Sequence, residues 1–328
     1  MRDLNQFQRY LVHEFVDDYH DGVMSRRDMM ARVLKITGSA AAAATTLTAL
    51  GVKAADAMAP ERLLRQGQPE PQSPLAVPEN DPSIAASSIE FQGEGAMIQA
   101  YEARPASGNA SPVAGTPEPA ATPAASGGLP LVLVCHENRG LQEHIRDVAR
   151  RLATQGYVAV AVDLLSREGG TAANQPDDIP AILSEADPAR HVGDFQAALA
   201  HYANDPSVDS ARTGMIGFCF GGGITWRTAT QTPELNAAVP FYGPPPPLED
   251  VPNIRAAVLG IYASDPGDFA NEGRDELEAA LAEAGITFRI NVYPGTEHAF
   301  HNDTGQRYNE EQALAAWRDT VAWLAEYV

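Results

Sequence analysis

Short apolar runs alternate with amphipathic segments through the second half of the chain. Six runs are mainly apolar and short enough to be buried strands, at 129–135, 157–165, 213–218, 237–243, 256–264 and 287–293. Segments with apolar positions three and four residues apart separate or follow them, at 141–156, 191–203, 273–285 and 314–324. Apolar strands separated by helices are typical of a parallel sheet covered on both faces. The pattern therefore predicts an α/β fold, with the chemistry beyond the carboxyl ends of the strands.

Two segments rich in proline and small polar residues interrupt the first half of the chain. Residues 58–87 are interpreted as a tether, and residues 103–128 as a flexible surface loop between two strands. The second segment has so few large apolar side chains that it cannot bury enough surface to offset its ordering entropy. We therefore expect one folded domain at 88–328, with the 103–128 loop inside it.

Residues 1–57 have the order of features found in an export signal. The arginine pair Arg26-Arg27 precedes a mildly apolar stretch of alanine, threonine and leucine, and Ala55-Asp56-Ala57 then offers a small-x-small cleavage site. Paired arginines before such a stretch are typical of a twin-arginine signal. The segment therefore predicts an exported protein that loses about its first 57 residues.

The same N-terminal segment has a second interpretation. Apolar and aromatic side chains recur at helical spacing ahead of the arginine pair, at Tyr10, Leu11, Phe15 and Tyr19. This spacing is typical of an amphipathic helix. The alternative to export is thus a helical arm that stays on a cytoplasmic enzyme.

Charge and cysteine content exclude several classes of protein. The 328 residues carry a formal net charge of −20, so the chain lacks the basic footprint of a nucleic-acid-binding protein. No run of 18 or more strongly apolar residues predicts a membrane span. Its two cysteines, Cys135 and Cys219, are too few for a disulfide framework. These features argue against nucleic acid and a membrane span, and they leave the ligand open.

One of the two cysteines lies between glycines at the end of a predicted strand. The sequence "GFCFG" places Gly217 and Gly221 two residues on either side of Cys219. A strand, this pentapeptide and a helix are the context of a nucleophile elbow, with cysteine where serine usually stands. The following helix N-terminus favours a thiolate. Cys135, by contrast, ends a buried strand and is expected to pack as a small apolar residue.

Two later strand ends supply partners for that cysteine. His298 follows the last predicted strand, and Asp265 follows the preceding one. Nucleophile, acid and histidine in this order are the triad order of the α/β-hydrolase fold. A cysteine nucleophile needs a base, and the base needs an orienting carboxylate. The three residues are therefore predicted to form a catalytic triad.

Five motifs together give the chain a family resemblance. In chain order they are "CHENRGLQEHI", "VDLLSR", "GFCFGG", "YASD" and "GTEHAF". With these motifs the chain from about Ser88 onward resembles the dienelactone hydrolases, or carboxymethylenebutenolidases. The resemblance implies an α/β-hydrolase fold and hydrolysis of small activated esters or lactones through an acyl-enzyme, with no metal or organic cofactor. A general carboxylesterase or thioesterase, and a silent thiol-based sensor or binding module on the same fold, are the alternatives.

The resemblance also implies a role for each site residue. Cys219 matches the nucleophile, His298 the base, and Glu137 the carboxylate that pairs with the resting cysteine. The amides of Phe220 and Asn138 match the oxyanion hole.

For the orienting acid, Asp268 competes with Asp265, because the loop that holds both has an unusual length against the family pattern. Asp265 is preferred because an Asp-Pro directly after the strand is the commoner arrangement in the family.

The substrate contacts depart from the family pattern. Dienelactone hydrolases hold the substrate carboxylate with two arginines, one of which matches Arg167. The other would follow the catalytic histidine, where this chain has His301, Asn302 and Asp303. The pair His298 and His301 has no third ligand at a sensible spacing, so no metal site is expected there.

Overall fold

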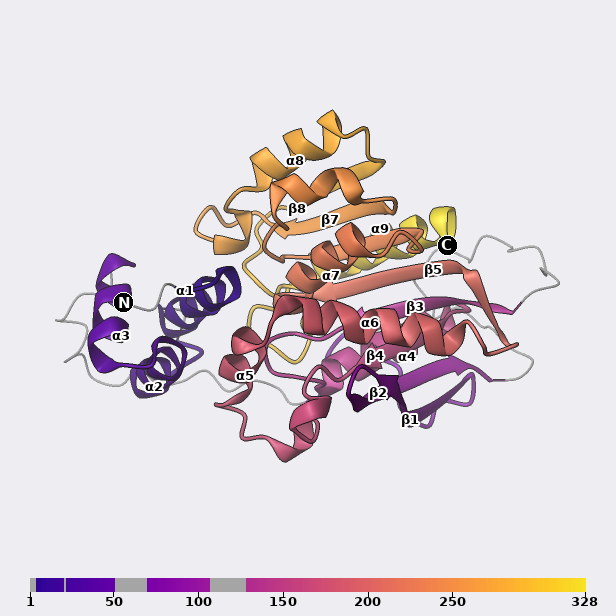
Figure 1. The fold of residues 1–328 in the computed structure, drawn as a ribbon, viewed down its shortest axis with the longest axis horizontal. Coiled ribbons are helices and arrows are strands. Elements are labelled where there is room, and N and C mark those ends of the chain that lie inside the picture. The colour runs from indigo at the N-terminus through magenta and orange to yellow at the C-terminus, as the bar shows by residue number, and fades with distance from the viewer. Residues whose placement is uncertain (1–3, 21, 51–69, 107–127) are drawn as a thin grey trace.

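A single sheet of eight strands forms the centre of the molecule. The computed structural model describes residues 4–20, 22–50, 70–106 and 128–328. Within them the strand order is β1-β2-β4-β3-β5-β6-β7-β8 (Figure 1). The strands are β1 (Ile84–Gly93), β2 (Ala96–Pro105), β3 (Leu129–Cys135), β4 (Val158–Val162), β5 (Val208–Phe218), β6 (Ala237–Phe241), β7 (Ala257–Ala263) and β8 (Phe288–Tyr293).

The sheet is parallel where the sequence predicts it to be. Strands β3 to β8 pair in parallel, whereas β1 pairs with β2, and β2 with β4, in the antiparallel sense. Strands β4 and β6 are buried at every position, as expected of strands covered on both faces. The prediction of a mostly parallel α/β-hydrolase sheet is confirmed.

Nine α-helices accompany the sheet in the described part of the chain. They are α1 (Gln6–His20), α2 (Arg26–Thr37), α3 (Ala40–Ala49), α4 (Glu143–Thr154), α5 (Ile179–Glu185), α6 (Pro188–Tyr202), α7 (Phe220–Gln231), α8 (Arg274–Glu283) and α9 (Glu310–Tyr327). None of the helices in this part of the chain is both long and apolar enough to cross a membrane.

Two glycines of β5 show how closely the helices approach the sheet. A Cβ on Gly214 would lie 3.0 Å from a methyl carbon of Leu324 in α9, and one on Gly217 would lie 2.2 Å from the hydroxyl of Thr225 in α7. Residues three apart in a strand point to opposite faces. Helices α7 and α9 therefore cover opposite faces of the sheet, with α6 and α7 in front of it in Figure 1.

The segment interpreted as a tether is partly integrated into the domain. Residues 84–87 form the beginning of β1, and Leu75 and Val77 are buried in the core. The backbone N–H of Val77 also donates to Asp147 of α4, at 2.7 Å. Within 58–87, residues 70–87 are thus held by contacts that its proline-rich composition does not show. Residues 58–69 and most of the 103–128 loop lie outside the described residues.

The N-terminal residues form three helices. Helix α1 carries the side chains that were expected at helical spacing, with Tyr10, Leu11 and Phe15 buried. The arginine pair opens α2, which Ser25 caps by accepting from the N–H of Asp28. Figure 1 shows α1 (indigo) as the N-terminal helix nearest the sheet. The expected cleavage site at 55–57 lies outside the described residues.

Candidate active site

Cys219 occupies a sharp turn between β5 and α7. Its backbone has φ 57° and ψ −120°, a conformation that costs a non-glycine residue about 1–3 kcal/mol. A Cβ on Gly221 would lie 2.4 Å from the carbonyl oxygen of His136, and Gly217 is equally crowded. Both glycines are therefore required for this turn. The strained cysteine between them has the geometry of a nucleophile elbow.

The thiol of Cys219 is enclosed, and its surroundings favour the protonated form. Its side chain is buried, with 1% of the residue exposed. Burial raises the pKa of the thiol well above its usual value, and the negative charges of Glu14 and Glu137 raise it further. A hydrogen bond with the side chain of Tyr10, and a smaller effect of the backbone N–H of Phe220, lower the pKa but do not outweigh the effects that raise it. A thiol in such surroundings needs a nearby proton acceptor before its sulfur can act as a nucleophile.

His298 lies on the loop after β8 and is held by a carboxylate. Its Nδ1 lies 3.1 Å from Oδ1 of Asp268, and both side chains are buried. Burial alone would lower the pKa of His298, but the Asp268 charge, their hydrogen bond and the Glu14 charge raise it overall. One ring nitrogen of His298, Sγ of Cys219 and a carboxylate oxygen of Glu14 all lie within 4.8 Å of one another.

The structure does not bring Asp265 to His298. The Asp265 carboxylate accepts from the N–H of Gly267 at 2.9 Å, so it stabilises its own turn. The carbonyl of Asp265 also accepts from the N–H of Asp268, at 3.1 Å, and this turn points Asp268 inward. There Asp268 caps the short 3₁₀ helix Phe269–Asn271 and reaches the histidine ring. Asp268, three residues after the expected Asp265, contacts the histidine because the loop folds back after β7.

Glu137 and Asn138 lie beyond β3, as the resemblance implies, but Glu137 has a different partner. Its Oε2 accepts from the side-chain amide of Asn302 at 2.6 Å. Its Oε1 is buried without a hydrogen-bond partner among the described residues. The carboxylate that is hydrogen-bonded to Cys219 is instead that of Glu14, whose Oε2 lies 3.3 Å from Sγ.

Helix α1 thus supplies two contacts that sequence reasoning missed. Besides Glu14, the hydroxyl of Tyr10 lies 3.2 Å from Nε2 of His298 and donates to the backbone carbonyl of Tyr242 at 3.0 Å. Glu14 and Cys219 are 205 positions apart in the chain. The one signal for such contacts was the helical spacing of aromatic residues in 6–20, which does not name the surface that the helix covers.

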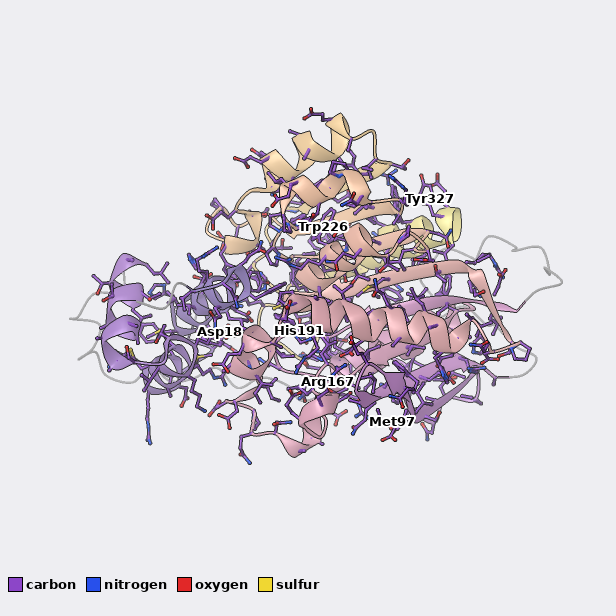
Figure 2. The ribbon with its side chains drawn as sticks, viewed as in Figure 1. Asp18, Met97, Arg167, His191, Trp226 and Tyr327 are labelled. Carbon is purple, nitrogen blue, oxygen red and sulfur yellow. The ribbon has the colours of Figure 1, made fainter. Side chains whose placement is uncertain are left out.

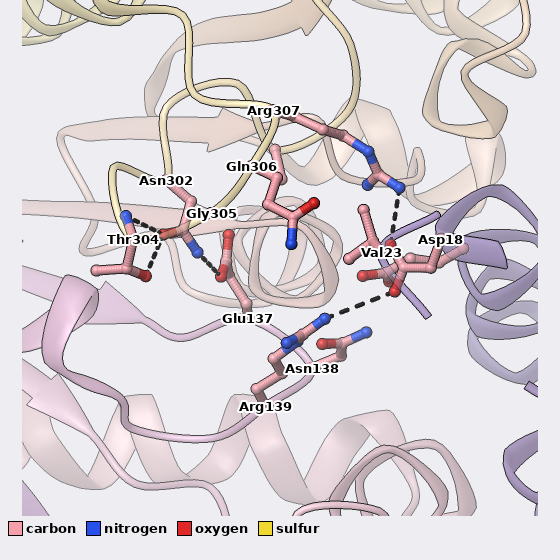
Figure 3. A pocket seen from close by; sticks show the side chains of 12 residues that line it. Asp18, Val23, Glu137, Asn138, Arg139, Asn302, Thr304, Gly305, Gln306 and Arg307 are labelled. Carbon is pink, nitrogen blue, oxygen red and sulfur yellow. Dashed lines mark hydrogen bonds and ion pairs between the residues drawn. The ribbon is translucent and has the colours of Figure 1, made fainter. Parts of the chain in front are cut away.

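A pocket of about 230 Å³ opens beside these residues (Figure 3). Glu137, Asn138 and Glu14 line it, together with Asp18 of α1. Figure 3 shows Arg139 and Arg307 reaching toward Asp18 from opposite sides. Cys219 and His298 are not among its lining residues.

Arg167, the expected substrate contact, is engaged elsewhere. Its Nη1 lies 2.7 Å from both carboxylate oxygens of Asp194 in α6, and its Nη2 donates to the carbonyl of Glu94 at 2.9 Å. Asp194 is 1% exposed, so the guanidinium compensates a buried charge. Arg167 does not line the pocket of Figure 3, and Figure 2 shows it apart from Asp18.

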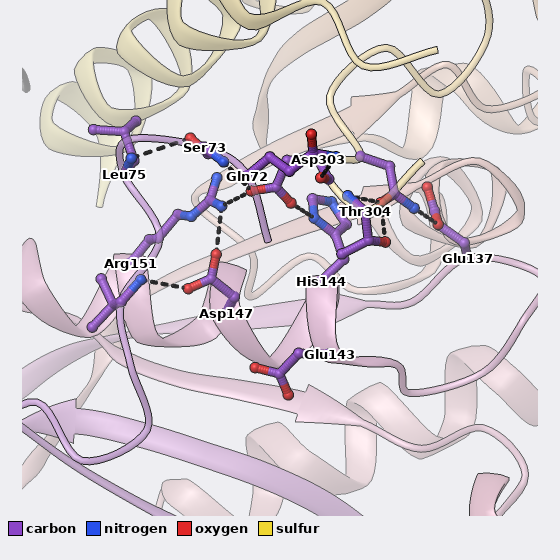
Figure 4. A network of polar contacts seen from close by, with 12 residues as sticks. Gln72, Ser73, Leu75, Glu137, Glu143, His144, Asp147, Arg151, Asp303 and Thr304 are labelled. Carbon is purple, nitrogen blue, oxygen red and sulfur yellow. Dashed lines mark hydrogen bonds and ion pairs between the residues drawn. The ribbon is translucent and has the colours of Figure 1, made fainter. Parts of the chain in front are cut away.

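A buried polar network centred on Asp303 holds the segment that follows His298 (Figure 4). Asp303 accepts from Arg151 at 2.5 Å and from the backbone N–H of Ser73 at 3.0 Å, and it pairs with Nδ1 of His144 at 2.8 Å. Burial alone would raise the pKa of Asp303, but the bond to His144 and the charge of Arg151 hold it well below its usual range. The network joins the catalytic loop, α4 and the 70–77 segment.

We expect Asp303→Ala to lower the free energy of unfolding by about 3–5 kcal/mol, because it removes the buried carboxylate that Arg151 and His144 share and leaves Arg151 with Asp147 alone as its ionic partner. The depressed pKa gives the same network a pH dependence: its contribution is complete above about pH 4 and is lost as the pH falls further. Urea unfolding at pH 7 and pH 3 measures both effects. Asp275→Ala on the exposed surface of α8 is the control and should have little effect. A loss equal to that of the control would contradict the role of the network.

The structure also places Cys135 and His301 and shows a cluster of residues that could bind a metal ion. Cys135 is fully buried in β3, and burial raises the pKa of its thiol well above the usual value. His301 is buried against Phe218 and Trp317 rather than paired with His298. The cluster of Glu14, Cys219 and His298 has a spacing that a metal ion could also bridge. That no metal takes part stays a prediction.

Comparisons with known proteins agree with this geometry. A model of the dienelactone hydrolase family matches residues 119–328. A carboxymethylenebutenolidase homologue of Salmonella typhi is 34% identical over 272 residues, which cover 78% of this chain and 93% of that protein. Its counterpart in Escherichia coli K12 is 33% identical over 273 residues, with the same coverage.

Solved structures show the same likeness. A dienelactone hydrolase from Klebsiella pneumoniae is 33% identical, with a TM-score of 0.64, over 74% of this chain and 99% of that one. An acylaminoacyl peptidase is 12% identical, with a TM-score of 0.58 over 76% of this chain and 42% of its own, and shares the fold alone.

Proposed function

This chain belongs to the dienelactone hydrolase family, and we propose that it cleaves small activated esters or lactones with Cys219 as the nucleophile. The family membership makes it a hydrolase of the ester and lactone type. The observation that supports the finer assignment is the alignment of Asp268, His298 and Cys219 at three strand ends, with the cysteine on a strained elbow. A binding module needs no such arrangement.

The proposed reaction begins with proton transfer. His298 takes the proton of the Cys219 thiol on Nε2, while Asp268 holds the other ring nitrogen and stabilises the imidazolium. The sulfur then attacks the carbonyl carbon, and the carbonyl oxygen gains the negative charge. The backbone N–H groups of Phe220 and Asn138 stabilise that oxygen, each by about 3 kcal/mol.

The second half of the reaction restores the enzyme. The carbon–oxygen bond to the leaving group breaks, the leaving alkoxide or enolate takes the proton from His298, and an acyl group remains on Cys219. His298 then accepts a proton from water, whose oxygen attacks the acyl carbon. The carbon–sulfur bond breaks, the acid leaves, and the proton returns to the sulfur.

The thiol chemistry can be tested with one ester. We expect turnover of p-nitrophenyl acetate that stops when iodoacetamide alkylates Cys219, because the alkylated sulfur cannot attack. Peptide mapping identifies the alkylated residue. Full turnover by protein alkylated at Cys219 would contradict the proposal. A panel of lactones, esters and thioesters then separates a lactone hydrolase from a general carboxylesterase or thioesterase, which would use the same residues.

For Arg167 we expect a structural effect without a change in substrate preference. Arg167→Ala leaves the buried Asp194 carboxylate without its partner, which should cost about 3 kcal/mol of unfolding free energy. The ratio of KM values for an anionic and a neutral p-nitrophenyl ester should not change. Urea unfolding and steady-state kinetics measure the two quantities. A selective rise in KM for the anionic ester would return Arg167 to the substrate site.

A further inference from the structure

Helix α1 places three polar side chains over the active site. Tyr10, Glu14 and Asp18 are spaced four residues apart, so they lie along one face of the helix. Tyr10 reaches Nε2 of His298, and Glu14 reaches Sγ of Cys219. The same nitrogen and the same sulfur must exchange a proton in the proposed reaction. The helix therefore occupies the polar atoms that catalysis requires.

The third side chain, Asp18, is held at the mouth of the pocket. Its carboxylate lies 2.7 Å from Nη2 of Arg307 and 3.6 Å from Nη2 of Arg139, and its side chain is 4% exposed. A carboxylate enclosed by two guanidinium groups is a charge-assisted contact. Arg139 directly follows Asn138, and Arg307 follows the histidine loop, so both arginines belong to the hydrolase domain.

Apolar contacts dock the same helix on the elbow. The ring of Phe7 lies 4.8 Å from that of Phe220, the residue after the nucleophile, and the ring of Tyr10 lies 4.6 Å from that of Phe269. A Cβ on Gly223 would lie 2.8 Å from the Phe7 ring, so the first turn of α7 is shaped to receive it. Phe7 is 3% exposed. The docking thus combines apolar burial with ionic contacts.

As a result, the nucleophile is closed to a substrate in this arrangement. Cys219 is 1% exposed and His298 is 4% exposed. The neighbouring pocket is lined by Glu14 and Asp18 of α1 but not by either catalytic residue. A carbonyl carbon must come into contact with Sγ to react. The space through which it would come is filled by the Glu14 and Tyr10 side chains.

We propose that α1 is an internal plug of the active site, which binds the hydrolase domain through Phe7, Glu14 and Asp18 and must be displaced before an ester can reach Cys219. The proposal rests on the proposed function of Cys219. The segment that occupies the active site is thus one that carries carboxylates, and one of these, Asp18, lies between Arg139 and Arg307. Substrate and helix compete for the same place, so the enzyme is latent while α1 is docked.

The test loosens the plug in the full-length chain without changing a catalytic residue. In the double variant Phe7→Ala/Asp18→Ala, the docked helix loses its ring contact with Phe220 and its ion pairs. We expect alkylation of Cys219 by iodoacetamide to become about tenfold faster or more, and kcat/KM for p-nitrophenyl acetate to rise by a similar factor, because both need the undocked state. Arg9→Ala, on the exposed side of α1, is the matched control and should leave both quantities unchanged.

A second variant guards against a folding defect. Asp18→Lys repels Arg139 and Arg307 and leaves the apolar contacts intact, so it should accelerate alkylation in the same direction. Urea unfolding of each variant shows whether the domain is intact. Unchanged alkylation in both variants, or a lower kcat/KM in a folded variant, would overturn the plug and make α1 part of the catalytic machinery. Faster alkylation without any ester hydrolysis would support the proposal that α1 is a plug and would refute the proposed hydrolase function instead.

Discussion

Cys219→Ala should abolish ester hydrolysis, with a loss of about 10⁴- to 10⁶-fold in kcat, the range that removal of a nucleophile causes in triad hydrolases. The alanine variant has no group that can form the acyl-enzyme, and His298 has no thiol to activate. Steady-state kinetics with p-nitrophenyl acetate measures the loss. Removing His298 as well should cost little more, because residues of a triad act as a unit.

Cys135→Ala is the matched control. Cys135 is fully buried in β3 and does not form the elbow, so we expect nearly normal turnover and a stability cost of about 1 kcal/mol. Equal losses of activity in the two variants would mean that both cysteines serve structure alone.

The second large effect is expected at the orienting acid. Asp268→Asn should lower kcat by about 10⁴-fold, as in the corresponding change of a serine protease, because the amide favours the wrong tautomer of His298. The pair is buried and only 3.1 Å apart, so no water can substitute for the carboxylate oxygen without rearrangement. Kinetics of the purified variant, with its fold verified by urea unfolding, measures the effect.

Asp265→Asn provides the comparison from the same loop. The Asp265 carboxylate contacts the N–H of Gly267, and asparagine can accept the same hydrogen bond. We therefore expect a change in kcat of less than about threefold. The reverse pattern, with a severe loss at Asp265 and a mild one at Asp268, would reassign the triad to the residue that the sequence favours.

The nucleophile elbow was predictable because its cause is local. The glycines two residues before and after Cys219 belong to the same turn, and Gly217 has no side chain where Thr225 of the following helix and the backbone of Gly221 approach it. The parallel strands β3 to β8 were predictable for a similar reason, since each has its own apolar run. Such features depend on neighbours in the sequence.

The contacts of the two candidate acids and of Arg167 could not be predicted, because their partners lie elsewhere in the chain. Which of Asp265 and Asp268 reaches His298 depends on whether the loop folds back. The backbone hydrogen bond between these two residues and the cap that Asp268 forms on the 3₁₀ helix decide this. Arg167 pairs with Asp194, which lies on a different helix and carries no motif. A sequence pattern gives the residue types, but it does not show whether the Arg167 guanidinium pairs with a substrate carboxylate or with Asp194.

The contacts of the N-terminal segment could not be predicted from its sequence either. Its arginine pair and apolar stretch were interpreted as an export signal, and we keep export as a proposal. The structure adds that α1, in the same segment, lies on Cys219 through Glu14. Cleavage at the expected site, Ala55-Asp56-Ala57, would remove the plug together with the signal, so export and release of the active site would be one event.

The most direct test of the account is to find the acyl group itself. Protein mixed with p-nitrophenyl acetate is quenched in acid within the first turnover, digested and mapped by mass spectrometry. The account predicts one acetyl group, bound to the peptide that contains Cys219 and absent from Cys219→Ala. An acetyl group on another residue, or a burst of p-nitrophenol with Cys219 unmodified, would contradict it.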